Sequence, residues 1–107
     1  MMKKGLNEIC YRFFVNLANP TRLAVLEQLM KHPMSVTELA EALGQEQSMI
    51  SHNLKTLLEC NFVYTQREGK KRIYSVNEET IGALFKAVEI HAEKFCPTSG
   101  KCHLKEN

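Results

Sequence analysis

Apolar residues recur at helical spacing over the first third of the chain. In the first segment they stand three or four positions apart, at Leu6, Ile9, Phe13 and Leu17, which predicts a helix. Asn19-Pro20 then predicts the start of a second helix, because Asn is a good N-cap and Pro fits the first helical position. We expect this second helix to end at His32-Pro33.

Two shorter helices follow, separated by a glycine. Residues 35–38 have the S-x-x-E form of a capping box, which predicts that a third helix starts there and stops at Gly44. A fourth helix is expected from after Glu46 to about Cys60. Its apolar positions follow an i, i+4, i+7, i+8 pattern and form one face, at Ile50, Leu54, Leu57 and Leu58.

The pattern then changes to that of a β-hairpin. Residues 62–67 and 72–76 are rich in aromatic and β-branched residues, which predicts two strands joined by a turn at 68–71. Glu78-Glu79 is expected to open a last helix, where negative charge suits the N-terminal end. Its apolar stripe comprises Ile81, Leu84, Phe85, Val88, Ala92 and Phe95. The predicted fold is therefore mainly α with a short β-hairpin: residues 1–95 form the domain, and residues 96–107 form a cysteine-containing tail.

Length and charge narrow the class of protein. A chain of 107 residues fits one small domain, and no apolar run approaches the roughly 18 residues of a membrane span. Residues 1–8 lack the apolar stretch of a signal peptide, so we expect a cytoplasmic protein without a membrane partner. The net charge of +2 excludes a disordered polybasic tail but allows a folded domain with one basic face. All 12 acidic residues are Glu, which excludes chemistry that needs Asp.

Two short helices joined by a Gly-containing turn and followed by a hairpin have the order of a winged helix-turn-helix. The second helix of such a pair fits the major groove, which is about 12 Å wide. At 100° per residue, polar residues cluster opposite its apolar face, at Ser48, Ser51, His52, Lys55 and Glu59. Basic residues surround the hairpin tip, where they can reach the DNA backbone or minor groove, at Arg67, Lys70, Lys71 and Arg72. Double-stranded DNA is therefore the predicted partner. No nucleophile–base pair or Gly-rich phosphate loop indicates an enzyme.

Residues 17–23, 38–40, 48–57 and 67–74 together resemble the ArsR/SmtB family of metal-sensing repressors, over nearly the whole chain. The resemblance implies a homodimer whose first and last helices form the interface. It also implies a repressor that leaves a palindromic operator when an inducer binds. Gln47, Ser48, Ser51 and His52 match the recognition-helix positions of the family, whereas Glu46 stands where the family often has Ser or Thr.

The family's sensor sites are only partly represented. Ser35-Val36-Thr37 replaces the Cys-Val-Cys of the arsenic-type site. The four zinc-type positions correspond to Glu78, Thr80, His91 and Lys94. Only the first and third of these can ligate, whereas tetrahedral zinc takes four donors, so we interpret this site as lost.

The four cysteines are the remaining candidates for a sensor. Cys96 and Cys102 form a flexible dithiol in the tail, and Cys10 on the apolar stripe of the first helix is a third candidate. Soft thiolates favour thiophilic ions, so the candidate inducers are As(III), Cd(II), Pb(II) and Zn(II). Cys60 matches a position used by cadmium- and lead-type relatives, but their second ligand falls on Thr56, and packing is the favoured role for Cys60.

The sequence leaves three hypotheses about the function. The leading hypothesis is a dimeric repressor released from its operator by a thiophilic metal or metalloid ion bound to the thiols. The first alternative is a redox-sensing repressor in which Cys96 and Cys102 form a disulfide. The second is a winged-helix module that senses nothing and binds another protein. Neither the inducer, the operator nor the participation of His103 follows from the sequence.

Overall fold

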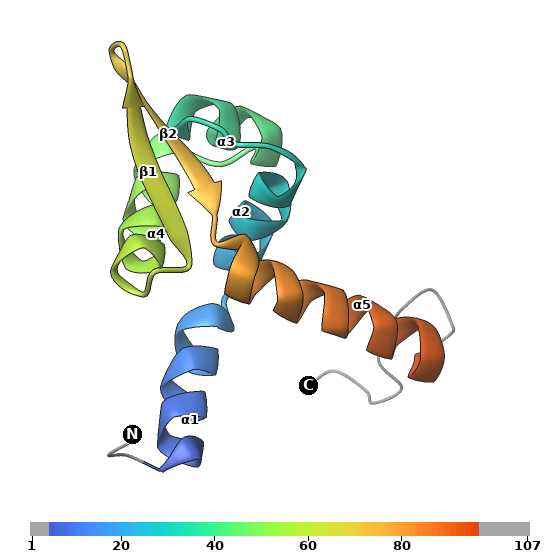
Figure 1. The fold of residues 1–107 in the computed structure, drawn as a ribbon. Coiled ribbons are helices and arrows are strands. Elements are labelled where there is room, and N and C mark those ends of the chain that lie inside the picture. The colour runs from blue at the N-terminus through green and yellow to red at the C-terminus, as the bar shows by residue number, and fades with distance from the viewer. Residues whose placement is uncertain (1–4, 97–107) are drawn as a thin grey trace. The chain divides into compact units, whose positions relative to one another are not determined.

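A computed structural model describes residues 5–96 of the chain, which divides into two units, Met1–Asn77 and Glu78–Asn107. The first unit contains four helices and an antiparallel hairpin: α1 (Leu6–Leu17), α2 (Pro20–Lys31), α3 (Val36–Leu43), α4 (Gln47–Glu59), β1 (Val63–Glu68) and β2 (Lys71–Val76) (Figure 1). The second contains η1 (Glu78–Gly82) and α5 (Ala83–Phe95). The predicted mainly helical fold with one hairpin is confirmed. Of the predicted tail, only Cys96 belongs to the described residues.

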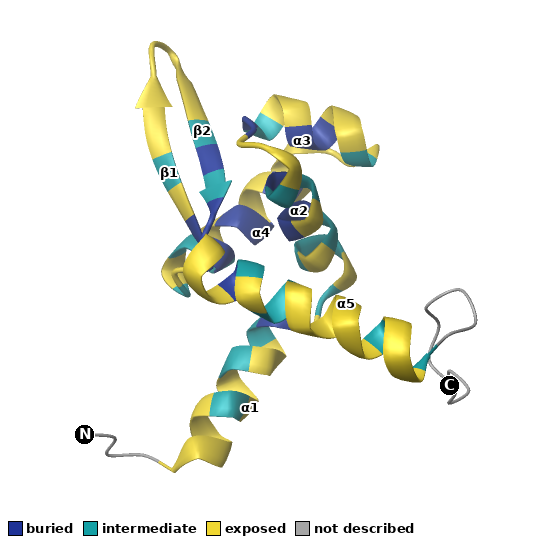
Figure 2. Ribbon diagram, turned by 45° about the vertical axis from the view of Figure 1, so that its right-hand side comes forward, coloured by how far each residue is buried: buried dark blue, intermediate teal, exposed yellow. Residues whose placement is uncertain are grey.

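The core of the first unit lies among α2, α3, α4 and the base of the hairpin. Its fully buried side chains come from all four of these elements: Val25, Leu26, Leu39, Ile50, Leu54, Leu57 and Val63. Figure 2 shows that the hairpin is buried near its base and exposed toward its tip. The inner face of α4 is therefore fixed by packing, while the far end of the hairpin stands in solvent.

The starts of α2 and α3 are set by side-chain caps. Asn19 Oδ1 accepts a 3.1 Å hydrogen bond from the backbone N–H of Arg22, and Pro20 occupies the first helical position. At α3 the capping box is complete. Ser35 Oγ accepts from the Glu38 backbone N–H at 3.2 Å, and Glu38 Oε1 accepts from the Ser35 backbone N–H at 2.8 Å. Both predicted caps are confirmed because each depends only on residues within one helical turn.

A residue in the left-handed conformation closes both α3 and α4. Gly44, with a φ of 63°, makes the turn between them, as the sequence predicts. After α4 the same role falls to Asn61, with a φ of 60°, which the sequence does not single out. The Asn61 N–H donates to the Leu58 carbonyl at 3.0 Å, and the Phe62 N–H donates to the Leu57 carbonyl at 2.9 Å. These two bonds form a Schellman motif with Asn in place of the commoner Gly.

The hairpin is short and anchored at its base. Its register runs from Val63 opposite Val76 to Glu68 opposite Lys71. The first strand is shifted by one residue from its predicted limits, while the second begins one residue early and ends at residue 76 as predicted. A reciprocal pair of backbone hydrogen bonds, 3.0 and 2.8 Å long, joins Met34 to Tyr74 of β2. The segment between α2 and α3 thus holds the hairpin, a contact that the sequence pattern does not predict.

The second unit begins with a π-helical turn. The predicted start of the last helix at Glu78 is confirmed, but Glu78–Gly82 forms the π-helix η1 before α5 begins. A Cβ added at Gly82 would lie 2.8 Å from Glu78 Oε1, so the glycine leaves room for that carboxylate. Among the described helices, none has the length and apolar character needed to cross a membrane.

Replacement of Asn61 tests the end of α4. A left-handed conformation costs an ordinary L-residue about 1–2 kcal/mol, so Asn61→Ala should lower the free energy of unfolding by roughly 1 kcal/mol. Asn61→Gly should leave it unchanged or raise it, because Gly adopts this conformation without steric cost. Urea denaturation of the three proteins measures the difference. Equal stabilities for the Ala and Gly variants would contradict the assignment.

Glu38 should make stability depend on acid pH. The Ser35 backbone N–H that donates to its carboxylate holds the pKa of Glu38 below its ordinary value of 4.5, with further contributions from the Ser35 side chain and the charges of Lys71 and His32. The stabilisation is therefore present above pH 4.5 and is lost as the pH falls below it. Glu38→Gln, which retains a capping side chain, should flatten this acid decline in thermal unfolding. Glu41→Gln on the same helix is the control, and an equal flattening there would contradict the prediction.

Candidate nucleic-acid interface

Helix α4 has one buried and one exposed face. Ile50, Leu54 and Leu57 have exposed fractions of 1% or less and anchor the helix in the core. The five predicted reading residues are all exposed: Gln47, Ser48, Ser51, His52 and Lys55. Their side chains supply hydroxyl, amide, imidazole and ammonium groups, which hydrogen-bond base edges and phosphates. The helix therefore presents a mainly polar surface to a partner, with Met49 as its one exposed large apolar side chain.

The N-terminus of α4 carries an acidic residue. Glu46 is the N-cap, in extended conformation, and its carbonyl accepts from the Ile50 N–H at 3.1 Å. Its side chain makes no capping hydrogen bond. The carboxylate suits the positive end of the helix dipole, and it adds a negative group beside the exposed face of the helix.

The hairpin, which we call the wing, concentrates positive charge at its tip. Arg67 of β1 lies directly opposite Arg72 of β2, Lys71 pairs with Glu68, and Lys70 lies in the turn. All five side chains are exposed. Like charges directly opposite each other destabilise a hairpin, so the pairing of the two strands gives no reason for two arginines at these positions.

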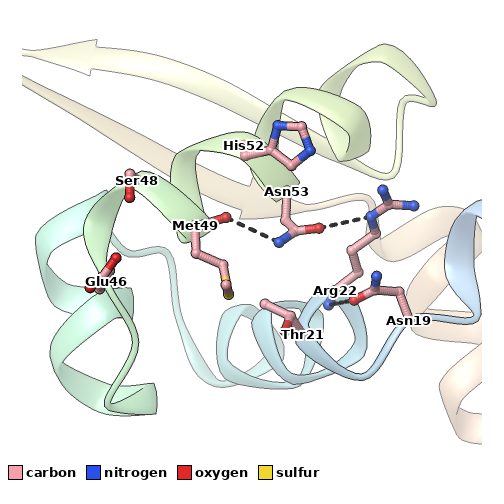
Figure 3. A pocket seen from close by; sticks show the side chains of 8 residues that line it. All are labelled: Asn19, Thr21, Arg22, Glu46, Ser48, Met49, His52 and Asn53. Carbon is pink, nitrogen blue, oxygen red and sulfur yellow. Dashed lines mark hydrogen bonds between the residues drawn. The ribbon is translucent and has the colours of Figure 1, made fainter.

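A hollow lies between the start of α2 and the first half of α4 (Figure 3). Two of the predicted reading residues, Ser48 and His52, are in its lining. The complete lining is Asn19, Thr21, Arg22, Glu46, Ser48, Met49, His52 and Asn53. The exposed face of α4 is thus continuous with the N-terminal end of α2.

One buried polar group in this region was not predicted from the sequence. Asn53 has an exposed fraction of 6% and accepts a 3.0 Å hydrogen bond from Arg22 Nε. Its position could have indicated this, because residue 53 stands in the buried stripe of α4 with Ile50, Leu54 and Leu57. A buried amide there requires a partner, but the sequence alone does not say which residue provides it.

The predicted thiol ligands lie in different parts of the chain. Cys10 on α1 and Cys96 directly after α5 are half-buried and free, while Cys102 lies outside the described residues, as does His103. Cys60, at the C-terminal end of α4, is also half-buried and free. Within residues 5–96, no group of three Cys, His or Glu side chains is placed to hold a metal ion. The three-thiol site therefore stays a prediction.

The zinc-type positions supply only two ligating side chains. Glu78 and Thr80 are exposed on η1, and His91 and Lys94 are exposed on α5. The ring of His91 packs against Phe95, with 5.0 Å between ring centroids. One carboxylate and one imidazole, with a hydroxyl and an ammonium, do not make a tetrahedral zinc donor set.

Comparisons with known proteins place the chain among transcriptional regulators. Residues 19–65 match the family model described as bacterial regulatory protein, arsR family. The chain is 40% identical over 77 residues to the HTH-type transcriptional regulator NmtR of Mycobacterium tuberculosis, covering 72% of this chain and 64% of NmtR. It is 37% identical over 73 residues to a probable mercury resistance operon repressor of Streptomyces lividans, covering 68% of this chain and 58% of the repressor. The matches span about three-fifths of these curated relatives.

Solved structures extend the likeness to nearly the whole chain. Rv0081 of M. tuberculosis superposes with a TM-score of 0.75 and 30% identity, over 89% of this chain and 97% of Rv0081. The homodimeric winged helix-turn-helix DNA-binding domain of Mb0332 from Mycobacterium bovis gives a TM-score of 0.72 and 25% identity, over 99% and 100% of the two chains. The fold is that of a winged helix-turn-helix regulator. The chain belongs to the arsR family, a family of bacterial regulatory proteins and not of enzymes.

Proposed function

We propose that the protein is a homodimeric repressor that binds an operator in double-stranded DNA through α4. The observation that carries this proposal is the division of α4 into a buried face and an exposed polar face. Because three fully buried residues hold the helix, the side chains of Ser48, Ser51 and His52 are presented from a rigid support. Such a helix fits the major groove, where hydrogen bonds to base edges carry sequence information.

The apolar surfaces of α1 and α5 support dimerisation. Of the eleven large apolar side chains exposed within residues 5–96, eight belong to these two helices: Leu6, Ile9, Tyr11, Phe14, Val15, Val88, Ile90 and Phe95. Apolar surface of this extent on a small domain is typical of a protein interface. The structural relative from M. bovis is homodimeric. A two-fold dimer would present two copies of α4 to half-sites about 34 Å apart, hence to a palindromic operator.

The basic tip of the wing would provide affinity without sequence preference. Arg67, Lys70, Lys71 and Arg72 are exposed and lie around one turn of the hairpin. Contacts between these cations and phosphates release counterions from the DNA. Binding would then combine base contacts by α4 with phosphate contacts by the wing, and Lys55 would add a cation on α4.

For the inducer we propose a thiophilic ion such as As(III), Cd(II) or Pb(II), held by Cys10, Cys96 and Cys102. Thiolates prefer soft ions, and the zinc-type positions lack a full donor set. One relative is named as a probable mercury resistance operon repressor, which supports a soft ion in general. Bound to the thiolates, such an ion would favour a dimer geometry in which the two α4 helices no longer match adjacent major grooves.

The proposed DNA binding predicts that two groups of variants lose affinity in different ways. On a duplex selected from a random pool by the wild-type protein, Ser51→Ala or His52→Ala should weaken binding by about 1–3 kcal/mol if the residue reads a base. Lys70→Ala with Lys71→Ala should weaken binding to selected and scrambled duplexes alike, and should lower the salt slope by about 2. Fluorescence anisotropy at several salt concentrations measures both effects.

Lys31→Ala, an exposed lysine at the end of α2, is the matched control and should bind like the wild type. A flat salt response of the wild-type protein, or failure to enrich any sequence, would contradict the repressor and favour a protein-interaction module.

A titration of the protein–DNA complex tests the inducer. As(III), Cd(II), Pb(II) and Zn(II) are added separately, and a disulfide oxidant is added in a parallel series. Thiophilic ions should release the wild-type protein from DNA, while Cys96→Ser and Cys102→Ser should stay bound. Release by the oxidant alone would favour the redox repressor. If both serine variants respond like the wild type, the tail thiols do not sense the inducer.

A further inference from the structure

Arg22 connects three helices of the first unit. It is the third residue of α2, yet its Nη1 donates a 2.8 Å hydrogen bond to the carbonyl of Asn16 in the last turn of α1. The last four carbonyls of a helix have no partner within that helix. A guanidinium at this point satisfies one of them and interacts favourably with the negative end of the helix dipole. Arg22 thus caps the C-terminus of α1.

The same guanidinium holds the buried side chain of α4. Arg22 Nε donates to Asn53 Oδ1 at 3.0 Å, and Asn53 Nδ2 donates to the Met49 carbonyl at 3.0 Å. Figure 3 shows both bonds as a chain that runs from α2 into α4. In this arrangement Arg22 is the partner of the Asn53 carbonyl oxygen, which is buried with the rest of the side chain. Removal of the Arg22 guanidinium would take away the donor to this buried oxygen, which is unfavourable.

The planarity of the guanidinium turns these bonds into a geometric constraint. Nε and Nη1 point in fixed directions within one plane, so Asn16 and Asn53 are held at fixed positions relative to each other. A lysine at position 22 keeps the charge, but a single ammonium does not reproduce the fork. Asn53 lies next to His52 and one helical turn after Met49, so it sits beneath the exposed face that carries the predicted reading residues.

We propose that Arg22 is a positioning residue for DNA recognition, which acts through Asn53 and touches no base. It sets the placement of α4 and ties that placement to the last turn of α1. This inference rests on the proposed function, since α1 is there a dimer helix and α4 the reading helix. A displacement of α1 within the dimer would then move Arg22 and, through its hydrogen bond, Asn53. The side chains of Ser48 and His52 on the same helix would move with Asn53.

A double-mutant cycle on DNA tests the proposal. Arg22→Lys, Asn53→Ala and the double variant are compared with the wild type on the selected and scrambled duplexes. Each single variant should lose about ten-fold in affinity for the selected duplex and change little on the scrambled one, with the salt slope unchanged. The double variant should be no weaker than the single variants, because both remove one interaction. Additive losses, equal losses on both duplexes or wild-type binding by Arg22→Lys would overturn the proposal.

A second measurement does not depend on DNA. Amide hydrogen exchange, at a temperature where circular dichroism shows all variants folded, should be faster in Arg22→Lys within α4 and the last turn of α1, by about ten-fold. Arg12→Lys, an exposed arginine on α1, is the matched control and should exchange like the wild type. Unchanged exchange in Arg22→Lys would overturn the inference even if the protein binds DNA. Failure of the wild type to select any DNA would instead overturn the proposed function, and accelerated exchange would still establish the constraint on α4.

Discussion

Burial of one face of α4 is the constraint on which the rest of the structure depends. Full burial of an aliphatic side chain contributes about 1.5–3 kcal/mol, and Ile50, Leu54 and Leu57 are all buried almost completely. With a helical period of 3.6 residues, this burial fixes which side chains face outward. The outward-facing side chains are not part of this core, so they can differ with the partner at little cost in folding free energy.

Several features that depend on neighbouring residues were predictable from the sequence, whereas the contacts between distant residues were not. The cap at Asn19, the capping box at Ser35 and the turn at Gly44 each require one helical turn of chain. The bond between Arg22 and Asn53 joins residues 31 positions apart, and no spacing rule indicates such a pair. The exposed polar positions Ser48, Ser51, His52 and Lys55 of α4 follow from periodicity, whereas the bond between Arg22 and Asn53 that supports the helix had to be found in the structure.

The end of α4 shows a second limit of local patterns. Gly is the usual residue in the left-handed conformation after a helix, so Gly44 was readily interpreted and Asn61 was not. The backbone carbonyl of Asn61 also accepts a 2.9 Å hydrogen bond from Asn77 Nδ2. This bond links the turn after α4 to Asn77, the residue that follows β2, and so closes the base of the wing. Asn61 thus has a role in the tertiary structure in addition to its local one.

The facing arginines of the wing give ionic strength two opposite effects. In the free protein, Arg67 and Arg72 repel each other across the hairpin, and dissolved salt screens that repulsion. In the proposed complex with DNA, the same two charges would face phosphates, and salt would weaken that attraction. Under the proposed function, salt would therefore stabilise the wing of the free protein and favour its dissociation from DNA. A nucleic acid that reached the wing would replace the screening ions, so under the proposed function the hairpin tip would be held most firmly in the complex.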